Sequence, residues 1–140
     1  YLQSKKKKLF SYEIFENLDL SKGNYEELEF QFSSFVGCNF TQSSWNKSHL
    51  LFSNLQNTML KNTKMEKMKI FDTDFSGATL EQVDFAGAKI KHVSFAGAKL
   101  IQVDFSKVLL AEEINFQDAQ IVDCKFPEEV GSGLLYHENR

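Results

Sequence analysis

Residues 75–100 read FSGATLEQVDFAGAKIKHVSFAGAKL, in which a large apolar side chain returns at every fifth position. Counting in fives keeps this register from Phe15 to Leu110, although only 42% of the chain is hydrophobic. These apolar centres are Phe15, Leu20, Tyr25, Phe30, Phe35, Phe40, Trp45, Leu50, Leu55, Leu60, Met65, Ile70, Phe75, Leu80, Phe85, Ile90, Phe95, Leu100, Phe105 and Leu110. A repeat sustained over this length decides the fold, because it determines how successive units stack.

A second column of residues lies two positions before each centre. Its members are mostly small or β-branched, and they include Ser33, Cys38, Ser43, Ser48, Ser53, Thr58, Thr63, Met68, Thr73, Ala78, Val83, Ala88, Val93, Ala98, Val103 and Val108. Large and small residues thus alternate along the chain. A close-packed interior needs this alternation of volumes when both columns face inward.

A period of five excludes both common regular structures. Five residues of an α-helix advance about 140° beyond a full turn, so the centres would spiral around the helix. On a flat strand, successive centres would alternate between its two faces. A short extended pair followed by a bend does place both columns on one side. Four bends close a square coil of twenty residues, and stacked coils lie about 4.8 Å apart. We therefore predict an all-β, single-domain solenoid.

The units FVGCNF (35–40), FSGATL (75–80), FAGAKI (85–90) and FAGAKL (95–100) resemble the pentapeptide-repeat family. The resemblance covers residues 10–126 and implies a right-handed quadrilateral β-helix. A parallel β-helix with a six-residue period is the structural alternative, but the period here is five. The units around Leu18, Gly23 and Leu28 depart from the pattern, and we place a one-residue insertion near 111–113, after which the register resumes at Phe116.

The two ends of the chain fall outside the repeat. Residues 1–9, with Lys5–Lys8, are expected to form a lead-in or cap for the first coil, since terminal coils of solenoids need polar caps. Residues 127–140 begin with Pro127 and are expected to form a C-terminal cap or tail. A homodimer contact at this end is the other reading, through Leu134, Leu135 and Tyr136.

Composition and cysteine placement limit the function classes. Lys and Arg number 16 against 19 Asp and Glu, a net charge of −3 that argues against direct nucleic-acid binding. No run approaches the roughly 20 apolar residues of a membrane helix, so no membrane contact is expected. Cys38 and Cys124 fall on different sides of distant coils and cannot pair, which fits a reducing compartment and favours a cytoplasmic location.

No catalytic constellation emerges from the repeat. His49 and His92 would lie two coils apart on one side, too far to share a metal ion. Gly77 and Gly87 recur at a turn position, where backbone conformation explains them better than a phosphate-binding loop. We therefore expect no enzymatic activity, no cofactor and no metal.

One side of the square is expected to carry an outward strip that differs from the other sides. Its apolar members are Phe32, Leu51, Phe52 and Phe71, and its basic members are Lys69, Lys89, Lys91 and His92. An exposed apolar patch usually marks an interaction site. The other reading is that the lead-in or the tail folds over the strip and buries it.

Three functions compete at this point. The first is a non-catalytic protein-binding or scaffold module that uses an outer face of the solenoid to bind a protein partner. The resemblance implies two alternatives, a DNA-mimic protector of DNA gyrase or topoisomerase and a secreted bacterial effector that docks a host protein. DNA mimicry requires a strongly negative surface, yet Asp84 and Asp104 share their predicted column with Lys64 and Lys125.

Overall fold

A computed structural model describes residues 8–127 and 136–138 of the chain. Every regular element within these residues is a β-strand, and the strands form two parallel sheets in the orders β1-β2-β3-β5-β7-β9-β11 and β10-β8-β6-β4. The strands are β1 (Leu9–Ser11), β2 (Glu29–Gln31), β3 (His49–Leu51), β4 (Met59–Lys61), β5 (Lys69–Phe71), β6 (Thr79–Asp84), β7 (Lys89–Ser94), β8 (Lys99–Asp104), β9 (Leu110–Phe116), β10 (Gln120–Val122) and β11 (Tyr136–Glu138).

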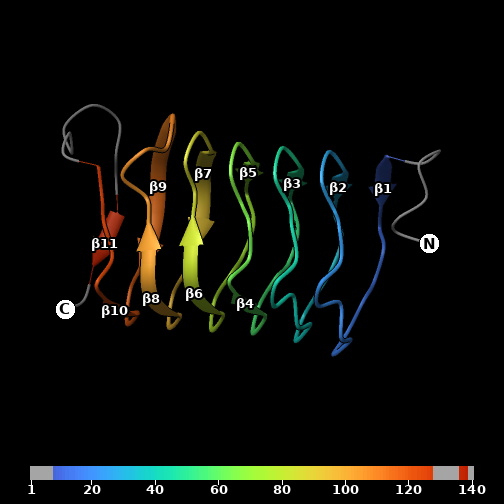
Figure 1. Ribbon diagram of the computed structural model, residues 1–140, viewed down its shortest axis with the longest axis horizontal. Coiled ribbons are helices and arrows are strands. Elements are labelled where there is room, and N and C mark those ends of the chain that lie inside the picture. Colours follow the sequence, from blue (N-terminus) through green and yellow to red (C-terminus); the bar gives the residue numbers. More distant parts are fainter. Residues whose placement is uncertain (1–7, 128–135, 139–140) are drawn as a thin grey trace.

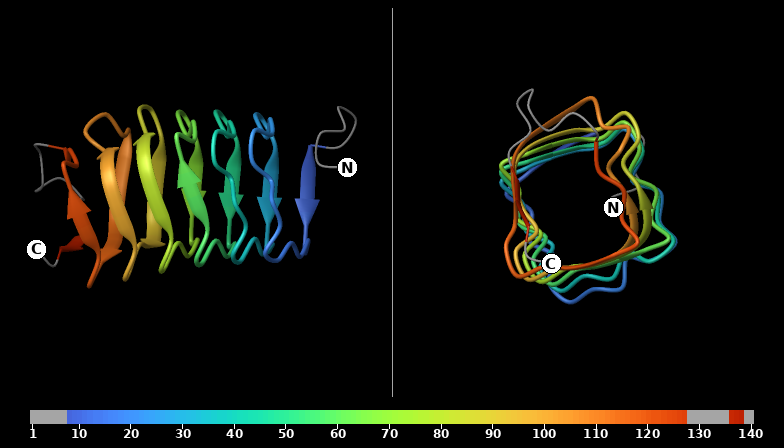
Figure 2. Two further views of the ribbon diagram at one scale, coloured as in Figure 1. Left: turned by 60° about the horizontal axis from the view of Figure 1, so that its bottom comes forward. Right: turned by 90° about the vertical axis from the view of Figure 1, so that its left-hand side faces the viewer.

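Successive coils stack along one axis, so the molecule is a rod (Figure 1). Viewed along that axis, the chain runs around a four-sided ring (Figure 2, right). The prediction of an all-β quadrilateral β-helix is confirmed. The described residues contain no helix that is long and apolar enough to cross a membrane.

Neighbouring coils pair in a constant register. Phe30 pairs with Leu50, and Leu50 pairs in turn with Ile70. Isolated bridges such as Ser34 to Asn54 repeat the same offset outside the strands. An inner coil is therefore hydrogen-bonded to a neighbour on each side, and the long sides of the rod have no free strand edge.

The core consists of the two columns that the sequence analysis identified. The centres from Tyr25 to Phe105 are buried, as are their small companions from Ser33 to Val103. Buried companion hydroxyls donate to backbone carbonyls, for example Ser43 Oγ to Phe40 O at 2.6 Å and Thr58 Oγ1 to Leu55 O at 2.8 Å. Small polar residues are accepted in this core because their donors are satisfied.

Each coil turns through a repeated left-handed corner. The residue two positions after a centre, which we call the corner residue, has a positive φ, as at Asn57 (59°) and Gly77 (71°). A Cβ added at Gly77 would lie 2.3 Å from Asn57 Oδ1 of the preceding coil, so a larger residue there would have to displace the Asn57 side chain. The side chain before each centre is often Asn or Asp, and it accepts the backbone N–H two residues ahead, as Asn54 Oδ1 does from Gln56.

The extra residue enters the chain earlier than predicted. The offset between hydrogen-bonded partners rises by one residue between Phe85–Asp104 and Gly87–Lys107. The series of positive-φ corners is also interrupted at Lys107. The predicted position of the insertion, near 111–113, is therefore wrong. The sequence did not show the shift because residues 109–111 are all apolar. A corner absorbs the extra residue without disturbing either sheet.

The shift also corrects one centre of the repeat. Ile90 pairs with Ala111, so Ala111 and not Leu110 takes the core position in this coil. Leu110 is only half-buried, and Leu109 is 71% exposed.

The ends of the rod are described in part. Leu9 already belongs to β1, so the paired structure begins one residue before the predicted boundary at residue 10. At the other end, β11 pairs in parallel with β9 and adds a strand to that side, with Tyr136 opposite Ile114. Residues 1–7 of the lead-in lie outside the described residues, and so do Leu134 and Leu135. The side chain of Tyr136 is not described. The predicted dimer or cap contact is therefore untested.

Two partly exposed Asp side chains make the stability of the coils depend on pH. Burial acts to raise the pKa of Asp74 and of Asp104, but hydrogen bonds from Ser76 and Gln56 to Asp74, and from Ser106 to Asp104, outweigh it. These bonds are short, at 2.6 Å for Gln56 Nε2 and 2.8 Å for the Ser76 N–H. The pKa of both carboxyls is therefore below the ordinary value of 3.8.

We expect the free energy of unfolding to fall in acid as these carboxylates are protonated. A pKa that is lowered in the folded state stabilises the fold fully above the unfolded value of about 4, and this stabilisation is lost as the pH falls through the folded pKa. The double variant Asp74→Asn/Asp104→Asn keeps the turn, because Asn39 and Asn54 occupy equivalent positions. Urea unfolding between neutral pH and pH 3 should show a shallower acid decline in this variant. An identical decline in both proteins would contradict the assignment.

Candidate protein-binding surface

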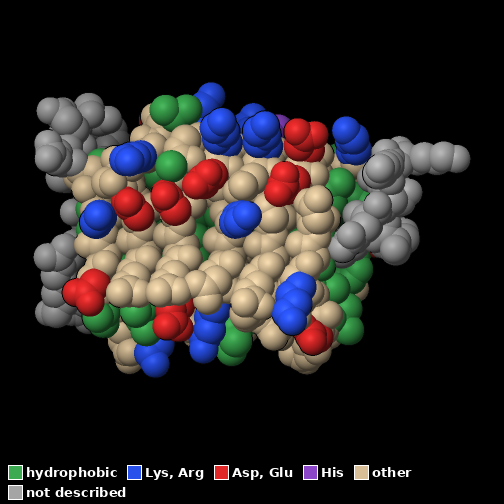
Figure 3. Space-filling view, viewed as in Figure 1, with side chains coloured by type: hydrophobic (Ala, Val, Ile, Leu, Met, Phe, Trp, Pro, Cys, Tyr) green, Lys and Arg blue, Asp and Glu red, His purple; other side chains and the backbone are tan. Residues whose placement is uncertain are grey.

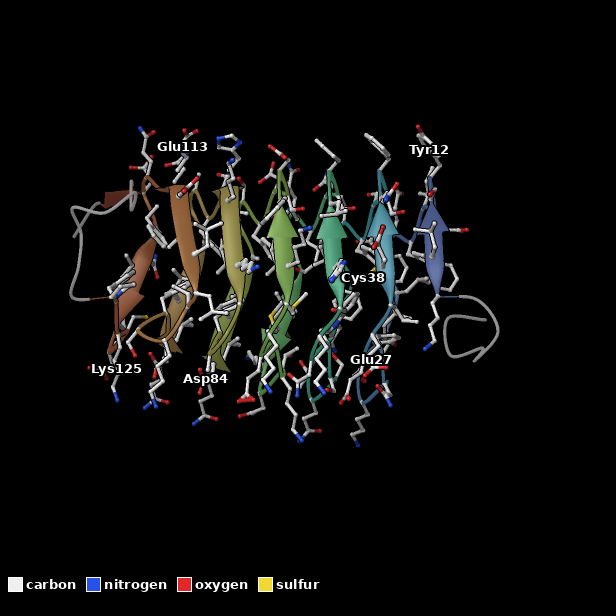
Figure 4. All side chains as sticks on the ribbon, turned by 90° about the horizontal axis from the view of Figure 1, so that it is seen from above. Tyr12, Glu27, Cys38, Asp84, Glu113 and Lys125 are labelled. Atoms are coloured by element: carbon white, nitrogen blue, oxygen red, sulfur yellow. The ribbon has the colours of Figure 1, made fainter. Side chains whose placement is uncertain are left out.

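Three exposed aromatic rings form a ladder along one long edge of the rod. The ladder consists of Tyr12, Phe32 and Phe52, the corner residues that follow β1, β2 and β3. The ring centroids lie 5.3 Å apart for Tyr12 and Phe32 and 5.0 Å apart for Phe32 and Phe52, with planes within 9° and 7° of parallel. The three residues are 74%, 47% and 52% exposed. Figure 4 shows Tyr12 projecting outward from this edge.

The aromatic ladder occupies backbone positions that disfavour large side chains. The φ angles are 58° at Tyr12 and 51° at both Phe32 and Phe52. A left-handed residue with a Cβ costs roughly 1–2 kcal/mol relative to the right-handed form, and bulky residues there are uncommon. Asn and Gly fill equivalent corners elsewhere, at Asn57 and Gly77. The same conformation recurs at corners with Lys, Glu and Gln, so it is a property of the fold and not of the rings alone.

The sequence analysis identified two of these rings but missed the third. Phe32 and Phe52 were recognised as outward members of the strip, and the structure places them next to each other. Tyr12 was overlooked because its coil lies before the clear repeat. Its position two residues after Phe10, one coil before Phe32, was the available signal.

The apolar surface continues from the aromatic ladder onto the neighbouring column. Leu51 and Phe71 pair across β3 and β5, and both are half-buried. The Lys69 Nζ lies 5.0 Å from the centroid of the Phe71 ring, a cation–π contact. The predicted strip of Phe32, Leu51, Phe52 and Phe71 is thus contiguous, and its Phe side chains at the corners are not core.

Beyond the aromatic ladder the same corner column becomes charged. His92 Nδ1 lies 3.1 Å from Asp72 Oδ1, and His92 Nε2 lies 2.5 Å from Glu113 Oε2. Lys91 also has an acidic neighbour, because its Nζ lies 3.8 Å from Glu112 Oε2. Among the predicted basic members of the strip, His92 and Lys91 thus face carboxylates from adjacent coils. Exposed pairs of this kind add little stability.

Among the described residues, Lys89 has no carboxylate partner. It stands beside Lys69 in the register of β5 and β7. Together with the Lys69 ammonium above Phe71, it keeps a positive region at the end of the apolar surface.

Within the part of the chain that the structure describes, the remaining titratable groups do not lie together at one place. His49 Nδ1 contacts Glu29 Oε1 at 3.1 Å, apart from the His92 cluster. Within residues 8–127 and 136–138, no three His, Cys, Asp or Glu side chains converge as metal ligands. Cys38 and Cys124 are free, and burial raises the pKa of both thiols. A raised pKa keeps a thiol protonated, and the protonated form is a poor nucleophile.

The charged side chains are mixed in sign over the surface. Bridges align Lys64 with Asp84 and Asp104 with Lys125, and β6 and β8 align the two Asp residues. The charged part of this column therefore begins and ends with lysine, as the sequence indicated. Figure 3 shows basic and acidic groups interspersed over the face that it displays. In Figure 4, Asp84 and Lys125 project from the edge opposite to Tyr12 and Glu113.

The structure defines a four-sided parallel β-solenoid with an exposed aromatic edge. The family model described as "Pentapeptide repeat region" matches residues 38–113, which is more than half of the sequence. The chain belongs to the pentapeptide-repeat family. No curated protein matches it.

Comparison with solved structures finds similar chains at low sequence identity. The pentapeptide repeat protein Rfr23 from the cyanobacterium Cyanothece 51142 is 14% identical, with a TM-score of 0.50, over 83% of this chain and 89% of Rfr23. HetL, a pentapeptide repeat protein involved in heterocyst differentiation regulation from Nostoc sp. strain PCC 7120, is 13% identical over 87% and 88% of the two chains, with a TM-score of 0.30.

A third similar structure is QnrB1 (R167E, trypsin treated), a plasmid-mediated fluoroquinolone resistance protein. It is 10% identical, with a TM-score of 0.45, over 94% of this chain and 92% of QnrB1. Sequence identities this low do not assign a function to this chain.

Proposed function

We propose that this chain is a non-catalytic protein-binding module whose contact surface is centred on the aromatic ladder. The observation that carries the proposal is the stack of Tyr12, Phe32 and Phe52, which remain about half or more exposed on a rigid edge. Aromatic residues are enriched in protein–protein interfaces, where they supply large contact areas. Contiguous exposed apolar surface usually marks such a site.

The rigidity of the scaffold supports the same proposal. Each ladder residue follows a strand that is hydrogen-bonded to neighbouring coils, so its backbone position is set before a partner arrives. The rings also stack on one another, which restricts their rotamers. A preorganised surface loses less conformational entropy on binding, and more of its contact energy contributes to affinity.

Topoisomerase protection by DNA mimicry is not favoured by a specific observation on this chain. A mimic needs a continuous acidic surface, whereas Lys64 and Lys125 flank the stacked pair Asp84 and Asp104. Docking to a host protein as a secreted effector would be one instance of protein binding, and no particular residue selects it.

The proposal predicts that the double variant Phe32→Asn/Phe52→Asn loses its partner while the fold is retained. Asn57 and Asn62 show that asparagine fits this corner, so the backbone should be undisturbed. Interface hot spots contribute at least about 2 kcal/mol each, and the double change should therefore weaken binding by roughly 100-fold or more. Affinity capture from the source organism's lysate, quantified by mass spectrometry with thermal unfolding in parallel, measures both effects.

The matched control is Gln82→Asn/Gln102→Asn, which changes two stacked corner residues on another edge of the rod. This control should retain the partner at the level of the unaltered protein. Retention of the partner by the ladder variant would refute the proposed surface. A large drop in its melting temperature would instead show that the rings serve stability.

A further inference from the structure

We infer that the segment bound by the aromatic ladder is an amphipathic α-helix with acidic residues beside its apolar stripe, lying along the rod. The inference rests on the proposed function and names the class of partner. It follows from the spacing of the rings, the hydrogen bonding of the sheet beneath them, and the distribution of charge around them.

The spacing of the aromatic ladder matches a helix and not an extended peptide. Successive ring centroids are separated by 5.3 Å and 5.0 Å. A helix advances about 5.4 Å per turn, so apolar residues three or four positions apart recur at nearly the same interval. Side chains on one face of an extended strand recur at about 6.6–6.8 Å. A strand would therefore be out of register by the third ring, whereas a helix would contact all three.

Backbone hydrogen bonding gives an independent reason. A peptide that binds as an added strand requires a free sheet edge. The ladder residues follow β1, β2 and β3. Of these strands, β2 and β3 each have a neighbouring strand on both sides, and β1, the first strand of the sheet, pairs with β2. This surface thus offers side chains but no ladder of unpaired backbone groups. A helix satisfies its own backbone groups and can bind through side chains alone.

The rings present their edges to the partner. Their planes are nearly parallel and the rings stack coil on coil, so the faces point along the rod and the edges point outward. The edge of an aromatic ring carries partial positive charge. Carboxylates and the faces of other aromatic rings are therefore favoured over ammonium groups at this surface.

Charges of both signs lie at the end of the apolar surface, because Asp72 follows Phe52 in the corner column and contacts His92. The path from Phe52 through Leu51 to Phe71 leads to Lys69 and Lys89, which pair in register across β5 and β7. Lys89 has no acidic partner among the described residues, and the Lys69 ammonium lies over the Phe71 ring. A helix that lays its apolar stripe on the ladder would gain by placing Asp or Glu above these two lysines.

Selection from displayed random peptides of about 20 residues, long enough for several helical turns, tests the inference on the full chain. Peptides are enriched on the unaltered protein and depleted on Phe32→Asn/Phe52→Asn. We expect enriched sequences with apolar residues three or four positions apart and an excess of Asp and Glu. Selected synthetic peptides should gain helical circular dichroism on binding. They should bind at least 10-fold more weakly to the ladder variant and several-fold more weakly to Lys69→Gln/Lys89→Gln.

The outcomes separate this inference from the function on which it rests. Ladder-dependent peptides with apolar residues at alternate positions, with basic flanks or without induced helicity would overturn the helix inference and leave the protein-binding surface in place. Absence of enrichment, or equal binding to the ladder variant, would overturn both. The Gln82→Asn/Gln102→Asn protein serves as the control and should bind every selected peptide normally.

Discussion

Phe95→Ala will lower the free energy of unfolding by about 3–5 kcal/mol, the usual cost of truncating a fully buried Phe. The Phe95 ring is completely buried and stacks on Phe75 at 5.2 Å and on Phe116 at 5.5 Å, with Phe105 edge-on at 5.7 Å. Removing the ring opens a cavity that is lined by residues of three successive coils. The hydrogen-bonded coils resist the collapse that would fill this cavity. Chemical denaturation followed by circular dichroism measures the loss.

Phe52→Ala is the matched control, since it deletes the same atoms from an exposed corner. Phe52 is 52% exposed, so the change removes less buried apolar area than at Phe95, together with one exposed ring stack worth about 0.5–1.5 kcal/mol. Its effect should therefore be several times smaller than that of Phe95→Ala. Similar losses at the two sites would mean that the inward and outward positions have been assigned wrongly.

Ala98→Leu will destabilise the protein by about 1–3 kcal/mol through overpacking. Ala98 is fully buried between Ala78 and Ala119, which occupy the same column in the adjacent coils. The large centres on the neighbouring sides already fill the interior, so three extra carbon atoms must displace the backbone. The melting temperature should fall by several degrees.

The neighbouring position distinguishes volume from hydrophobicity. Lys99→Leu introduces the same side chain at the next residue, which is exposed, and its effect should stay within about 0.5 kcal/mol. An Ala98→Leu protein as stable as the parent would contradict the claim that the companion column is limited by volume.

The fold was predictable because its core repeats along the sequence. A single rule, a large apolar residue at the centre and a small residue two positions before it, identified buried residues as far apart as Tyr25 and Phe105. The rule required no scale of secondary-structure propensities. The rule failed where several consecutive residues were apolar, because more than one of them could have been the centre. Leu109, Leu110 and Ala111 are all apolar, so the sequence alone did not show which of them faces inward.

The candidate surface was less predictable, because outward residues follow no such rule. Phe32, Phe52, Leu51 and Phe71 stood out as apolar exceptions among polar positions, and the structure brings them together. The carboxylates that face His92 come from Asp72 and Glu113 in the adjacent coils, and the shifted register after Lys107 hid the second of them. The exposure of these outward residues also depends on the path of the chain outside the repeat. A repeat pattern does not encode that path.

The left-handed corners have a consequence for how this protein can diverge. Because the corner side chains point away from the axis, substitutions there leave the packing of the interior unchanged. The outer residues of each coil are thus free to drift or to be selected for a new partner, while the centres remain constrained. Rfr23 can therefore share this architecture at 14% identity. We therefore expect sequence differences between relatives to concentrate at the corners and to be fewer at the buried centres.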